Sequence, residues 1–342
     1  MNILVTASHT PFIHGGASYL AQGLVAALRA AGHQVELMGF PFSFQPERDI
    51  HRLMDFCAGL DLSAPNGQPV ERVISLQFPG YAVAHPHHTL WLIHQHRSVY
   101  ELYDPNTATP EQSKLREAVI AFDQRYLARI PARFTISQRV ADRLQDYSGI
   151  SARGLLHPPA YAEGYYNAEP QPYLFCPSRL EQLKRQDLLI EAARHLRSPL
   201  VILIAGTGGQ LSRYQQLIDQ YGLHRRVRLL GSVSEAEKIA LYANALAVFF
   251  APFDEDYGYI TLEAMLAAKP VITCTDSGGP LEFVLPDETG RVVPPDPQAI
   301  AAAIDHLHAD RQAAIALGRA GRARYEALQL SWPRTVETLL GV

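Results

Sequence analysis

Residues 2–38 read NILVTASHTPFIHGGASYLAQGLVAALRAAGHQVELM, and this stretch decides the fold class. It opens with a short apolar run, which is followed by a loop containing two adjacent glycines. Leu20, Leu24 and Leu28 then recur at the spacing of an amphipathic helix, and a glycine follows the helical pattern. A second apolar run comes next. The stretch therefore predicts a strand, a helix and a second strand, the unit from which parallel sheets are built.

The same alternation continues along the chain. Further strands are expected at residues 73–76, 90–93, 134–136, 173–176, 200–205, 227–230, 247–251, 271–273 and 291–293, with a helix at 111–129 among the first of them. Near residues 157–172 the sequence becomes rich in proline and tyrosine without apolar periodicity, which indicates a linker. Apolar strands that alternate with helices indicate an α/β fold with two doubly wound, Rossmann-like domains facing a central cleft.

Length and composition argue against several classes of protein. The chain has 342 residues, enough for two domains, and its 47% apolar and 19% charged residues are ordinary for a globular protein. A net charge of −4 argues against a dedicated nucleic-acid binder. There is no apolar run long enough to span a membrane, no signal peptide, and no cysteine spacing typical of a disulfide framework or metal site. We therefore expect a cytoplasmic protein with no nucleic-acid partner.

An acidic loop after the strand at 247–251 is the most informative segment. Residues 251–265 read APFDEDYGYITLEAM, which predicts a strand end, a loop and a helix that starts near Tyr259. Glu255 in the loop and Glu263 early in the helix would accept hydrogen bonds from sugar hydroxyls, while the amides at the helix start would face an anion. The alternative is a solvated acidic loop before a helix whose early glutamate complements its dipole.

Two further loops follow strands of the second array. Residues 177–185 read PSRLEQLKR, in which Arg179 and Lys184 would converge on a diphosphate. The alternative is a basic helix entry on a solvated surface. Residues 206–208 read GTG, which resembles a nucleotide-binding loop but lacks the complete G-x-G-x-x-G pattern.

Together these segments resemble the retaining GT-B glycosyltransferases of family 4, the group 1 glycosyltransferases. Glu255 and Glu263 match the E-x7-E motif of that family, and Arg179 and Lys184 match its R-x4-K pair. Residues 206–208 match its G-x-G loop. The resemblance covers nearly the whole chain.

The N-terminal half carries weaker matches to the same family. Residues 14–17 read HGGA and match its Gly-Gly loop, and the histidine expected at the end of an N-domain strand maps to His94, with His96 as a near rival. The chain also ends like a family member, with Trp332 before a terminal helix. One departure is Ala268, because glycine is common in the family before the lysine at position 269.

The resemblance implies a domain division and a role for each motif residue. The N-terminal acceptor-binding domain would comprise residues 1–165, the C-terminal nucleotide-sugar-binding domain residues 166–328, and a helix at 329–342 would cross back to the first domain. The implied catalytic residues are His94, Arg179, Lys184 and Glu255, and the implied donor-binding residues are Gly15, Gly16, Gly206, Gly208, Tyr257, Gly258, Tyr259 and Glu263.

The implied activity is retaining, metal-independent and cofactor-free glycosyl transfer. The donor would be a nucleoside-diphosphate sugar with UDP or GDP, and the acceptor a glycan, a lipid-linked or a small molecule, in bacterial surface-polysaccharide or glycoconjugate synthesis. Two alternatives stay open: a non-catalytic nucleotide-sugar binder, and a metal-dependent transferase, since residues 254–256 read formally as D-x-D. A nicotinamide dehydrogenase is disfavoured because neither array carries G-x-G-x-x-G.

Basic residues exceed acidic ones in one part of the first half. Residues 112–153 hold eight Lys or Arg against four Asp or Glu. This excess would suit peripheral contact with the anionic inner surface of a membrane. The alternative is a solvated helical face. The motifs identify neither the donor base, the sugar nor the acceptor.

Overall fold

The computed structural model of the chain describes every residue except 14 and 342, and it divides into two compact units. Unit 1 comprises residues 1–157 and 331–342, and unit 2 comprises residues 158–330. The chain therefore enters unit 2 at Pro158, where the proline- and tyrosine-rich segment begins, and it returns to unit 1 at Ser331.

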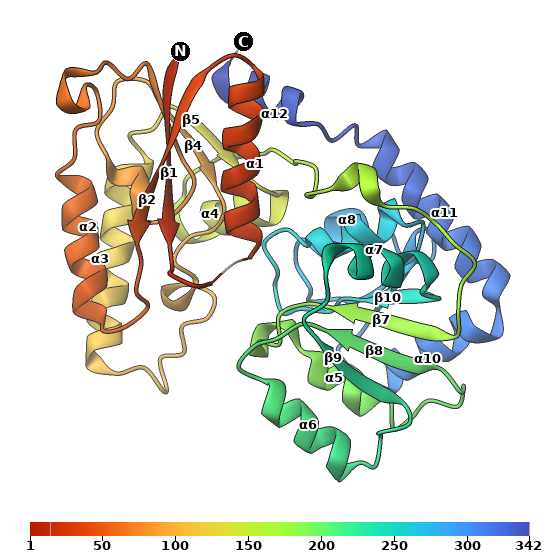
Figure 1. Cartoon of the computed structure of the whole chain (residues 1–342). Helices are drawn as coiled ribbons and strands as arrows, with labels where there is room; N and C mark the ends of the chain where they lie inside the picture. The colour runs from red at the N-terminus through yellow and green to blue at the C-terminus, as the bar shows by residue number, and fades with distance from the viewer. Residues whose placement is uncertain (14, 342) are drawn as a thin grey trace. The chain divides into compact units, whose positions relative to one another are not determined.

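Unit 1 is built on a parallel sheet of six strands with the order β2-β1-β3-β4-β5-β6 (Figure 1). The strands are β1 (Asn2–His9), β2 (Gln34–Pro41), β3 (Arg72–Ser75), β4 (His88–Leu92), β5 (Ala132–Thr135) and β6 (Arg153–Gly154). The first five agree with the sequence prediction. We did not predict β6, because two residues leave no periodic pattern to detect.

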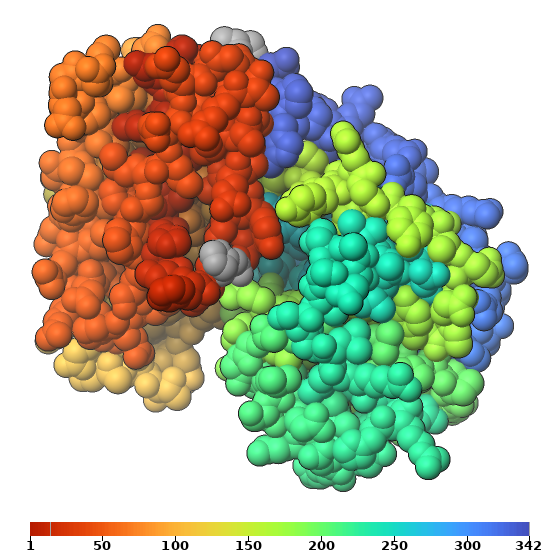
Figure 2. Space-filling model, viewed as in Figure 1, coloured from red at the N-terminus to blue at the C-terminus, as the bar shows by residue number. Residues whose placement is uncertain are grey.

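Within the described residues, five α-helices accompany this sheet. They are α1 (Gly16–Ala30), α2 (Glu47–Ala58), α3 (Pro110–Leu127), α4 (Gln138–Ser148) and α12 (Trp332–Leu340). The expected terminal helix is α12, and Trp332 is its first residue rather than the residue before it. Its ring lies so close to α1 that a Cβ added at Gly23 would be 2.3 Å from it. In the space-filling view, the N-terminal segments, coloured red to orange, form most of the surface of unit 1 that faces the viewer (Figure 2).

Unit 2 is built on a second parallel sheet of six strands, in the order β12-β11-β10-β7-β8-β9. The strands are β7 (Tyr173–Pro177), β8 (Val201–Ala205), β9 (Val227–Gly231), β10 (Ala247–Phe249), β11 (Val271–Cys274) and β12 (Gly290–Val293). All six were expected from the sequence. The chain starts at the centre with β7, runs outward through β8 and β9, and resumes on the other side of β7 with β10.

The helices of unit 2 connect these strands, so the expected α/β class with two doubly wound sheets is confirmed. They are α5 (Gln186–Ala192), α6 (Leu211–Gln220), α7 (Glu235–Asn244), α8 (Tyr259–Leu266), α9 (Pro280–Phe283), α10 (Pro297–Ala309) and α11 (Arg311–Ala327). No helix among the described residues of the chain combines the length and the apolarity needed to cross a bilayer.

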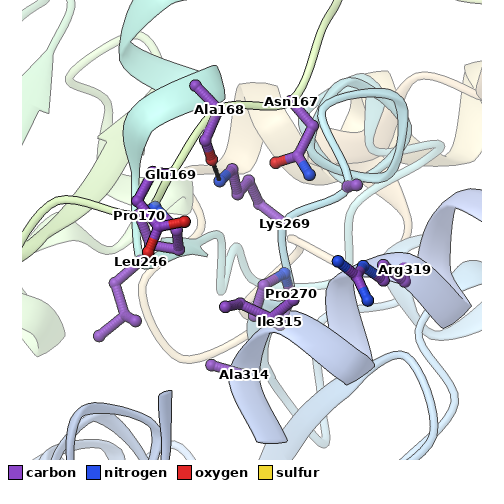
Figure 3. Close-up of a pocket in the computed structure, with 11 residues that line it drawn as sticks. Asn167, Ala168, Glu169, Pro170, Leu246, Lys269, Pro270, Ala314, Ile315 and Arg319 are labelled. Atoms are coloured by element: carbon purple, nitrogen blue, oxygen red, sulfur yellow. Dashed lines mark hydrogen bonds between the residues drawn. The ribbon is translucent and has the colours of Figure 1, made fainter. Parts of the chain in front are cut away.

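A cavity of about 220 Å³ lies at the amino edge of this sheet (Figure 3). Pro170, Leu246 and Pro270, which line it, stand just before β7, β10 and β11 respectively. Residues of α11 close the cavity from outside. It is thus separated by the length of the strands from the loops at their carboxyl ends.

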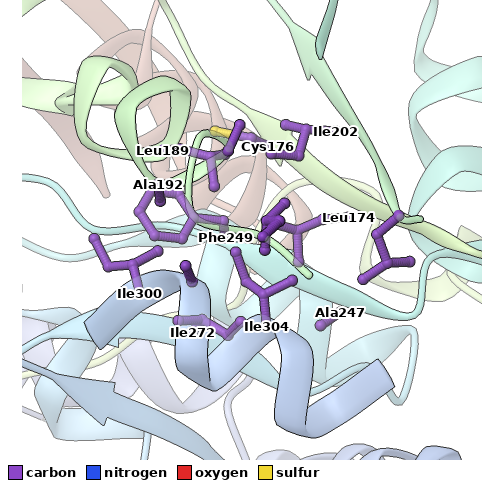
Figure 4. Packing of buried hydrophobic residues seen from close by; sticks show 14 of the residues in the cluster. Leu174, Cys176, Leu189, Ala192, Ile202, Ala247, Phe249, Ile272, Ile300 and Ile304 are labelled. Atoms are coloured by element: carbon purple, nitrogen blue, oxygen red, sulfur yellow. The ribbon is translucent and has the colours of Figure 1, made fainter. Parts of the chain in front are cut away.

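The main core of unit 2 lies between the sheet and the α5 and α10 helices (Figure 4). Phe249 of β10, Ile272 of β11 and Ile304 of α10 are almost completely buried in it. The alternation of branched strand residues with small helix residues such as Ala192 allows the layers to approach closely. This packing fixes the strand ends from which the functional loops emerge.

Candidate active site

The loops predicted to be functional leave two neighbouring strands of unit 2. Strands β7 and β10 pair directly, although β8 and β9 separate them in the sequence. The strand order therefore reverses between them, and ligands of open α/β sheets bind beyond the carboxyl ends of the strands at such a point. Arg179 and Lys184 follow β7, and Glu255 follows β10.

Lys184 and Glu255 form an ion pair at this edge. The Lys184 Nζ atom lies 2.5 Å from Glu255 Oε2, and the two side chains are 17% and 19% exposed. The same ammonium lies 5.6 Å from the centroid of the Phe250 ring, which adds a cation–π attraction. Lys184 belongs to a short 3₁₀ turn (Gln182–Lys184), which points the side chain across β7 toward the acidic loop. The structure thus brings together two residues that lie 71 positions apart in the sequence.

Arg179 differs from Lys184 in that its guanidinium is exposed. Among the described residues it has no hydrogen-bond or ion-pair partner, while its backbone carbonyl accepts a hydrogen bond of 3.0 Å from the Gln186 side chain. The backbone of this loop is therefore held in place, while the Arg179 guanidinium stays in contact with water. It presents a positive charge in the same loop as Lys184. Such a group binds a phosphate with little rearrangement of the backbone.

Arg185 is the residue that sequence reasoning undervalued. Its guanidinium donates two hydrogen bonds of 2.7 Å to the Asp276 carboxylate and one of 2.9 Å to each of the carbonyls of Ala251 and Pro252. Arg185 therefore ties the loop after β7 to the loops after β10 and β11. This role is visible only in the structure, because in the sequence Arg185 is simply a second basic residue next to Lys184.

Glu263 lies in the second turn of α8, buried beneath α7. Its Oε2 accepts a hydrogen bond of 2.6 Å from the Tyr242 hydroxyl, and its Oε1 lies 3.3 Å from Lys238 Nζ. Burial and the nearby Glu263 charge raise the pKa of Tyr242 far above its ordinary value. Burial lowers the pKa of Lys238, but attraction to Glu263 and Glu235 outweighs burial, and the net shift is upward. The Glu263 carboxylate is therefore held in place by Tyr242 and Lys238, and its oxygens keep lone pairs that could accept hydrogen bonds from a ligand.

Sequence reasoning also missed Lys238 and Tyr242, although a signal for them exists. Ser234 and Glu237 form a capping box at the start of α7, which fixes where the helix begins. Lys238 and Tyr242 are then four residues apart and share one helix face. A cation and a hydroxyl on the same face predict a polar neighbour, which the structure identifies as Glu263.

The acidic loop is held by backbone contacts to the loop after β11. Glu255 N donates to Ser277 O at 2.9 Å, and Gly279 N donates to Glu255 O at 2.8 Å. A Cβ at Gly279 would lie 2.6 Å from Tyr257 O, so the close approach requires glycine there. Gly258 has a φ of 96° and caps α8, which a residue with a side chain would adopt only with strain. The loop therefore presents Glu255 on a rigid support.

Tyr257 and Tyr259 differ in their surroundings. Tyr257 is 2% exposed and packs edge-on against Phe283 at 5.5 Å between ring centroids. Tyr259 is half-buried as the first residue of α8, and burial with the nearby Glu263 charge raises the pKa of its hydroxyl. The two rings therefore support the start of α8, where the sequence predicts contacts to a donor.

Gly206 and Gly208 have a structural explanation of their own. Their φ angles are 139° and 157°, and a Cβ on them would lie 1.9 Å from Ser178 O and 2.5 Å from Leu180 O. The loop after β8 is joined to the loop after β7 by a hydrogen bond of 2.9 Å from Leu180 N to Thr207 O. These glycines let the two loops meet at Ser178 and Leu180, the residues on either side of Arg179 in the chain.

His94 follows β4 in unit 1 and is half-buried. Its Nδ1 lies 2.7 Å from the backbone oxygen of Gln95. His96, the rival residue, is only 6% exposed and stacks on Phe78 at 5.2 Å between ring centroids. Burial, with repulsion from His94, lowers the pKa of His96 to about 4. Of the two histidines, His94 is the more accessible to a ligand.

Gly15 and Gly16 stand at the start of α1, at the carboxyl end of β1. Gly15 is the N-terminal cap residue of the helix, and its carbonyl accepts a hydrogen bond of 3.1 Å from Tyr19 N. His14, the first residue of the matched HGGA segment, lies outside the described residues. The free backbone amides at the N-terminus of a helix of this length favour the binding of an anion.

The acidic run at residues 254–256 does not gather its side chains into one group. Asp254 is 7% exposed and has a φ of 45°, whereas Glu255 is bonded to Lys184. In the part of the chain that the structure describes, no group of three or more His, Cys, Asp or Glu side chains is arranged to hold a metal ion.

Most of the basic excess at residues 112–153 is used within unit 1. Arg143 pairs with Glu101 at 2.6 Å, and Arg133 donates to the carbonyl of Ile130 at 2.7 Å. Four more arginines, Arg116, Arg125, Arg129 and Arg153, lie over the rings of tyrosine or phenylalanine. These contacts favour a structural role for the excess, and membrane contact stays a prediction.

Comparison with known proteins places this site in a family. Residues 162–324 match the family described as glycosyl transferases group 1. Over 163 residues, 43% of this chain and 39% of the relative, the sequence is 32% identical to the alpha-1,3/1,6-mannosyltransferase ALG2 of Homo sapiens. Over 169 residues, 46% of this chain and 44% of the relative, it is 34% identical to a GDP-mannose-dependent alpha-(1-6)-phosphatidylinositol monomannoside mannosyltransferase of Mycolicibacterium smegmatis. The matches thus span about two fifths of the length of these relatives.

The fold extends the likeness to the whole chain. Sucrose-phosphate synthase from Thermosynechococcus elongatus superposes with a TM-score of 0.78 over 98% of this chain and 96% of that one, at 20% identity. The matched family segment lies within unit 2, and it contains Arg179, Lys184, Glu255 and Glu263. Residues 162–324, just under half of this chain, therefore match the group 1 glycosyltransferases, and the whole chain has the fold of sucrose-phosphate synthase.

Proposed function

We propose that this chain transfers a sugar, with retention of its anomeric configuration, from a nucleoside-diphosphate sugar to a hydroxyl group of an acceptor. The observation that carries the proposal is the placement of Arg179, Lys184 and Glu255 where the strand order of unit 2 reverses. Two cations in one loop suit a diphosphate, and a carboxylate in the adjacent loop suits sugar hydroxyls. The GDP-mannose dependence of the mycobacterial relative supports this donor class, with GDP or UDP as the nucleotide.

The ion pair between Lys184 and Glu255 prepares both groups for the donor. A lysine and a glutamate at 2.5 Å hold each other in place before the donor binds. A donor diphosphate would compete with Glu255 for the ammonium, which leaves the carboxylate free to accept from the sugar. Glu263, already held by Tyr242 and Lys238, would accept from the ribose hydroxyls.

The transfer step follows from these placements. The acceptor oxygen forms a bond to the anomeric carbon, while the bond from that carbon to the diphosphate oxygen breaks and its electron pair stays on the diphosphate. The acceptor proton passes to the departing diphosphate oxygen. Arg179 and Lys184 stabilise the charge that develops on this oxygen, so the step needs no carboxylate nucleophile and no metal.

We further propose that unit 1 binds the acceptor, with His94 beside the reacting sugar. The half-buried ring with its Nδ1 on the Gln95 backbone leaves Nε2 for a sugar hydroxyl. The acceptor would be a glycan, a lipid-linked or a small molecule, consistent with a role in bacterial surface-polysaccharide or glycoconjugate synthesis. Gly15 and Gly16, at the start of α1, would contribute to donor binding.

The donor is tested by a thermal-shift screen against UDP, GDP, ADP and dTDP. A ligand that binds the native state raises its melting temperature by mass action, so the preferred base should stand out. The positive nucleotide is then used as its sugar conjugate, and release of the nucleoside diphosphate is measured with candidate acceptors. Absence of both binding and release with all four nucleotides would contradict the proposal.

Stereochemistry and metal independence are tested on the same reaction. The anomeric coupling constant in proton NMR of the product should equal that of the donor, and turnover should survive an excess of EDTA. Inversion would contradict the retaining assignment. Loss of activity in EDTA with recovery on Mn²⁺ would instead support a metal-dependent transferase.

A further inference from the structure

The cavity at the amino edge of the unit 2 sheet has a chemistry that the proposed reaction does not use. Its charged lining residues are Glu169 from the segment before β7, Lys269 from the turn between α8 and β11, and Arg319 from α11. Two cations therefore face one carboxylate. Asn167 adds an amide that donates hydrogen bonds, and Leu246 and Ile315 belong to the apolar part of the wall.

Lys269 is the least hydrated of these groups. Its side chain is only 2% exposed, and its Nζ donates one hydrogen bond of 2.8 Å to Ala168 O (Figure 3). An ammonium has three donors, so one carbonyl compensates only part of the hydration that burial removes. Burial, opposed in part by the Glu169 charge, accordingly lowers the pKa of Lys269 to about 8. At neutral pH the ammonium remains charged and would gain from a nearby anion.

Arg319 and Asn167 are the accessible groups of the cavity. Both are exposed, and neither has a hydrogen-bond or ion-pair partner within the described parts of the chain. Arg319 lies on a helix that packs tightly against the turn, since a Cβ at Gly318 would be 2.1 Å from Ala268 O. The guanidinium is therefore carried on a fixed support next to the buried lysine.

We propose that this cavity binds a small phosphate-class oxyanion, held by Lys269 and Arg319 with Asn167 as an additional donor. Charge-assisted hydrogen bonds from an ammonium and a guanidinium are among the strongest available to a phosphate. The volume of about 220 Å³ is smaller than the roughly 300–1,000 Å³ of cofactor and drug sites, so the ligand is a free phosphate or a compact phosphomonoester rather than a nucleotide.

The site would act on unit 2 without occupying the donor position. It joins the segment through which the chain enters the sheet, Asn167–Pro170, to α11, the last helix before the chain leaves unit 2. Lys269 Nζ and Ala243 O already hold Ala168 in this segment. An anion between Lys269 and Arg319 would add a further link, which stabilises unit 2 and stiffens its entry segment.

The test is thermal unfolding at constant ionic strength with inorganic phosphate, sulfate, glycerol phosphate or chloride. We expect a saturable rise in melting temperature of about 2–4 °C with phosphate over chloride. Arg319→Ala should abolish the rise, and Arg319→Glu should abolish it as well. A response to glycerol phosphate equal to that of phosphate identifies a phosphomonoester site, and a response to phosphate alone identifies a free-ion site.

Two control variants separate this site from the others. Arg225→Ala removes an exposed arginine of unit 2 that does not line the cavity, and it should keep the rise. Arg179→Ala removes the proposed donor cation and should also keep it. A rise that persists in Arg319→Ala, or one that disappears in Arg179→Ala instead, would overturn the proposal. Lys269→Met, if it folds, should also abolish the rise in melting temperature. Because Lys269 is buried and this variant could fail to fold, the test rests on the variants of the exposed Arg319.

Discussion

The carboxyl edges of the two sheets are stabilised by different chemistry. In unit 2 the loops are held by charged pairs, with Lys184 on Glu255 at 2.5 Å and Arg185 on Asp276 at 2.7 Å. In unit 1 the loop after β4 is held by rings, such as His96 stacked on Phe78, and by Glu101, which pairs with Arg97 and Arg143 through side chains that are at most 13% exposed. In unit 2, Lys184 follows a strand and is available to a ligand as a positive charge. In unit 1, His96 follows a strand but is buried against Phe78.

This difference suits the two substrates that the proposed reaction needs. Every nucleoside-diphosphate sugar carries the same diphosphate, so fixed cations serve all donors, and the family match falls within unit 2 alone. Acceptors differ in shape more than in charge. The comparison is consistent with our proposal that unit 2 supplies the catalytic charge and unit 1 selects the acceptor.

The largest expected effect comes from removing the charges of unit 2. Arg179→Ala and Lys184→Ala should each lower turnover by about 10²- to 10³-fold, because each removes stabilisation of the departing diphosphate. Turnover with a donor identified by the nucleotide screen measures the effect, and circular dichroism checks the fold. Arg225→Ala, which removes an exposed arginine of the same unit, should leave turnover unchanged. Near-wild-type turnover in both of the first two variants would remove the diphosphate contact from the mechanism.

The second effect tests the hydrogen-bond network around Asp123 in unit 1. Asp123 is completely buried and accepts hydrogen bonds from the hydroxyls of Tyr81 and Tyr100 and from the Gln95 amide. Burial raises the pKa of Asp123 from its ordinary 3.8 to about 6, which the hydrogen bonds oppose. The native state then binds the proton more tightly than the unfolded state, so this group stabilises the fold fully below pH 4 and loses that contribution as the pH rises to 6.

Asp123→Asn removes this titration while keeping the shape of the side chain. The stability of the variant relative to the wild type should therefore increase between pH 4 and 6 and level off above it, with a total change of about 3 kcal/mol. Urea unfolding at several pH values measures it. Since Gln95 lies next to His94 and is bonded to Asp123 at 3.0 Å, the same variant also reports on how the His94 loop is held. A relative stability independent of pH would show that Asp123 titrates normally.

Sequence reasoning found the strands because each is a run of apolar, β-branched residues bounded by a loop, and it found the glycine and acidic motifs because their spacing is local. It did not find Arg185, Lys238 or Asp123, because each acts through a partner distant in the chain. The shortest of the separations described above is the 23 residues between Tyr100 and Asp123, and Lys238 lies 25 residues from Glu263. It also assigned Gly206 and Gly208 to donor binding alone, whereas the approach of their loop to Ser178 and Leu180 requires glycine without any ligand.

The third effect distinguishes the structural role of Arg185 from the proposed catalytic role of Lys184 in unit 2. Arg185→Lys keeps the positive charge but loses the paired hydrogen bonds to Asp276 and those to two carbonyls, so we expect a loss of stability of about 2 kcal/mol. Urea unfolding measures this loss. Turnover at a temperature where the variant is folded should fall much less than in Lys184→Ala. Turnover losses of the same size would mean that Arg185 touches the donor, and the division between the two neighbouring basic residues would fail.

The smallest effect concerns the turn that carries Lys269. Ala268 ends α8 with a φ of 52°, in the left-handed region where a Cβ costs about 1 kcal/mol, and this is the position at which glycine is common in the family. Ala268→Gly removes that cost in the native state, but glycine also makes the unfolded chain more flexible, which lowers the free energy of unfolding. We therefore expect a net stabilisation of about 0.5 kcal/mol. The matched control is Ala267→Gly. Ala267 has a φ of −82° and is completely buried, so glycine there should instead destabilise by about 1 kcal/mol. The two variants differ only in the backbone conformation and burial of neighbouring alanines, and a difference of the opposite sign in urea unfolding would show that the turn is not left-handed in solution.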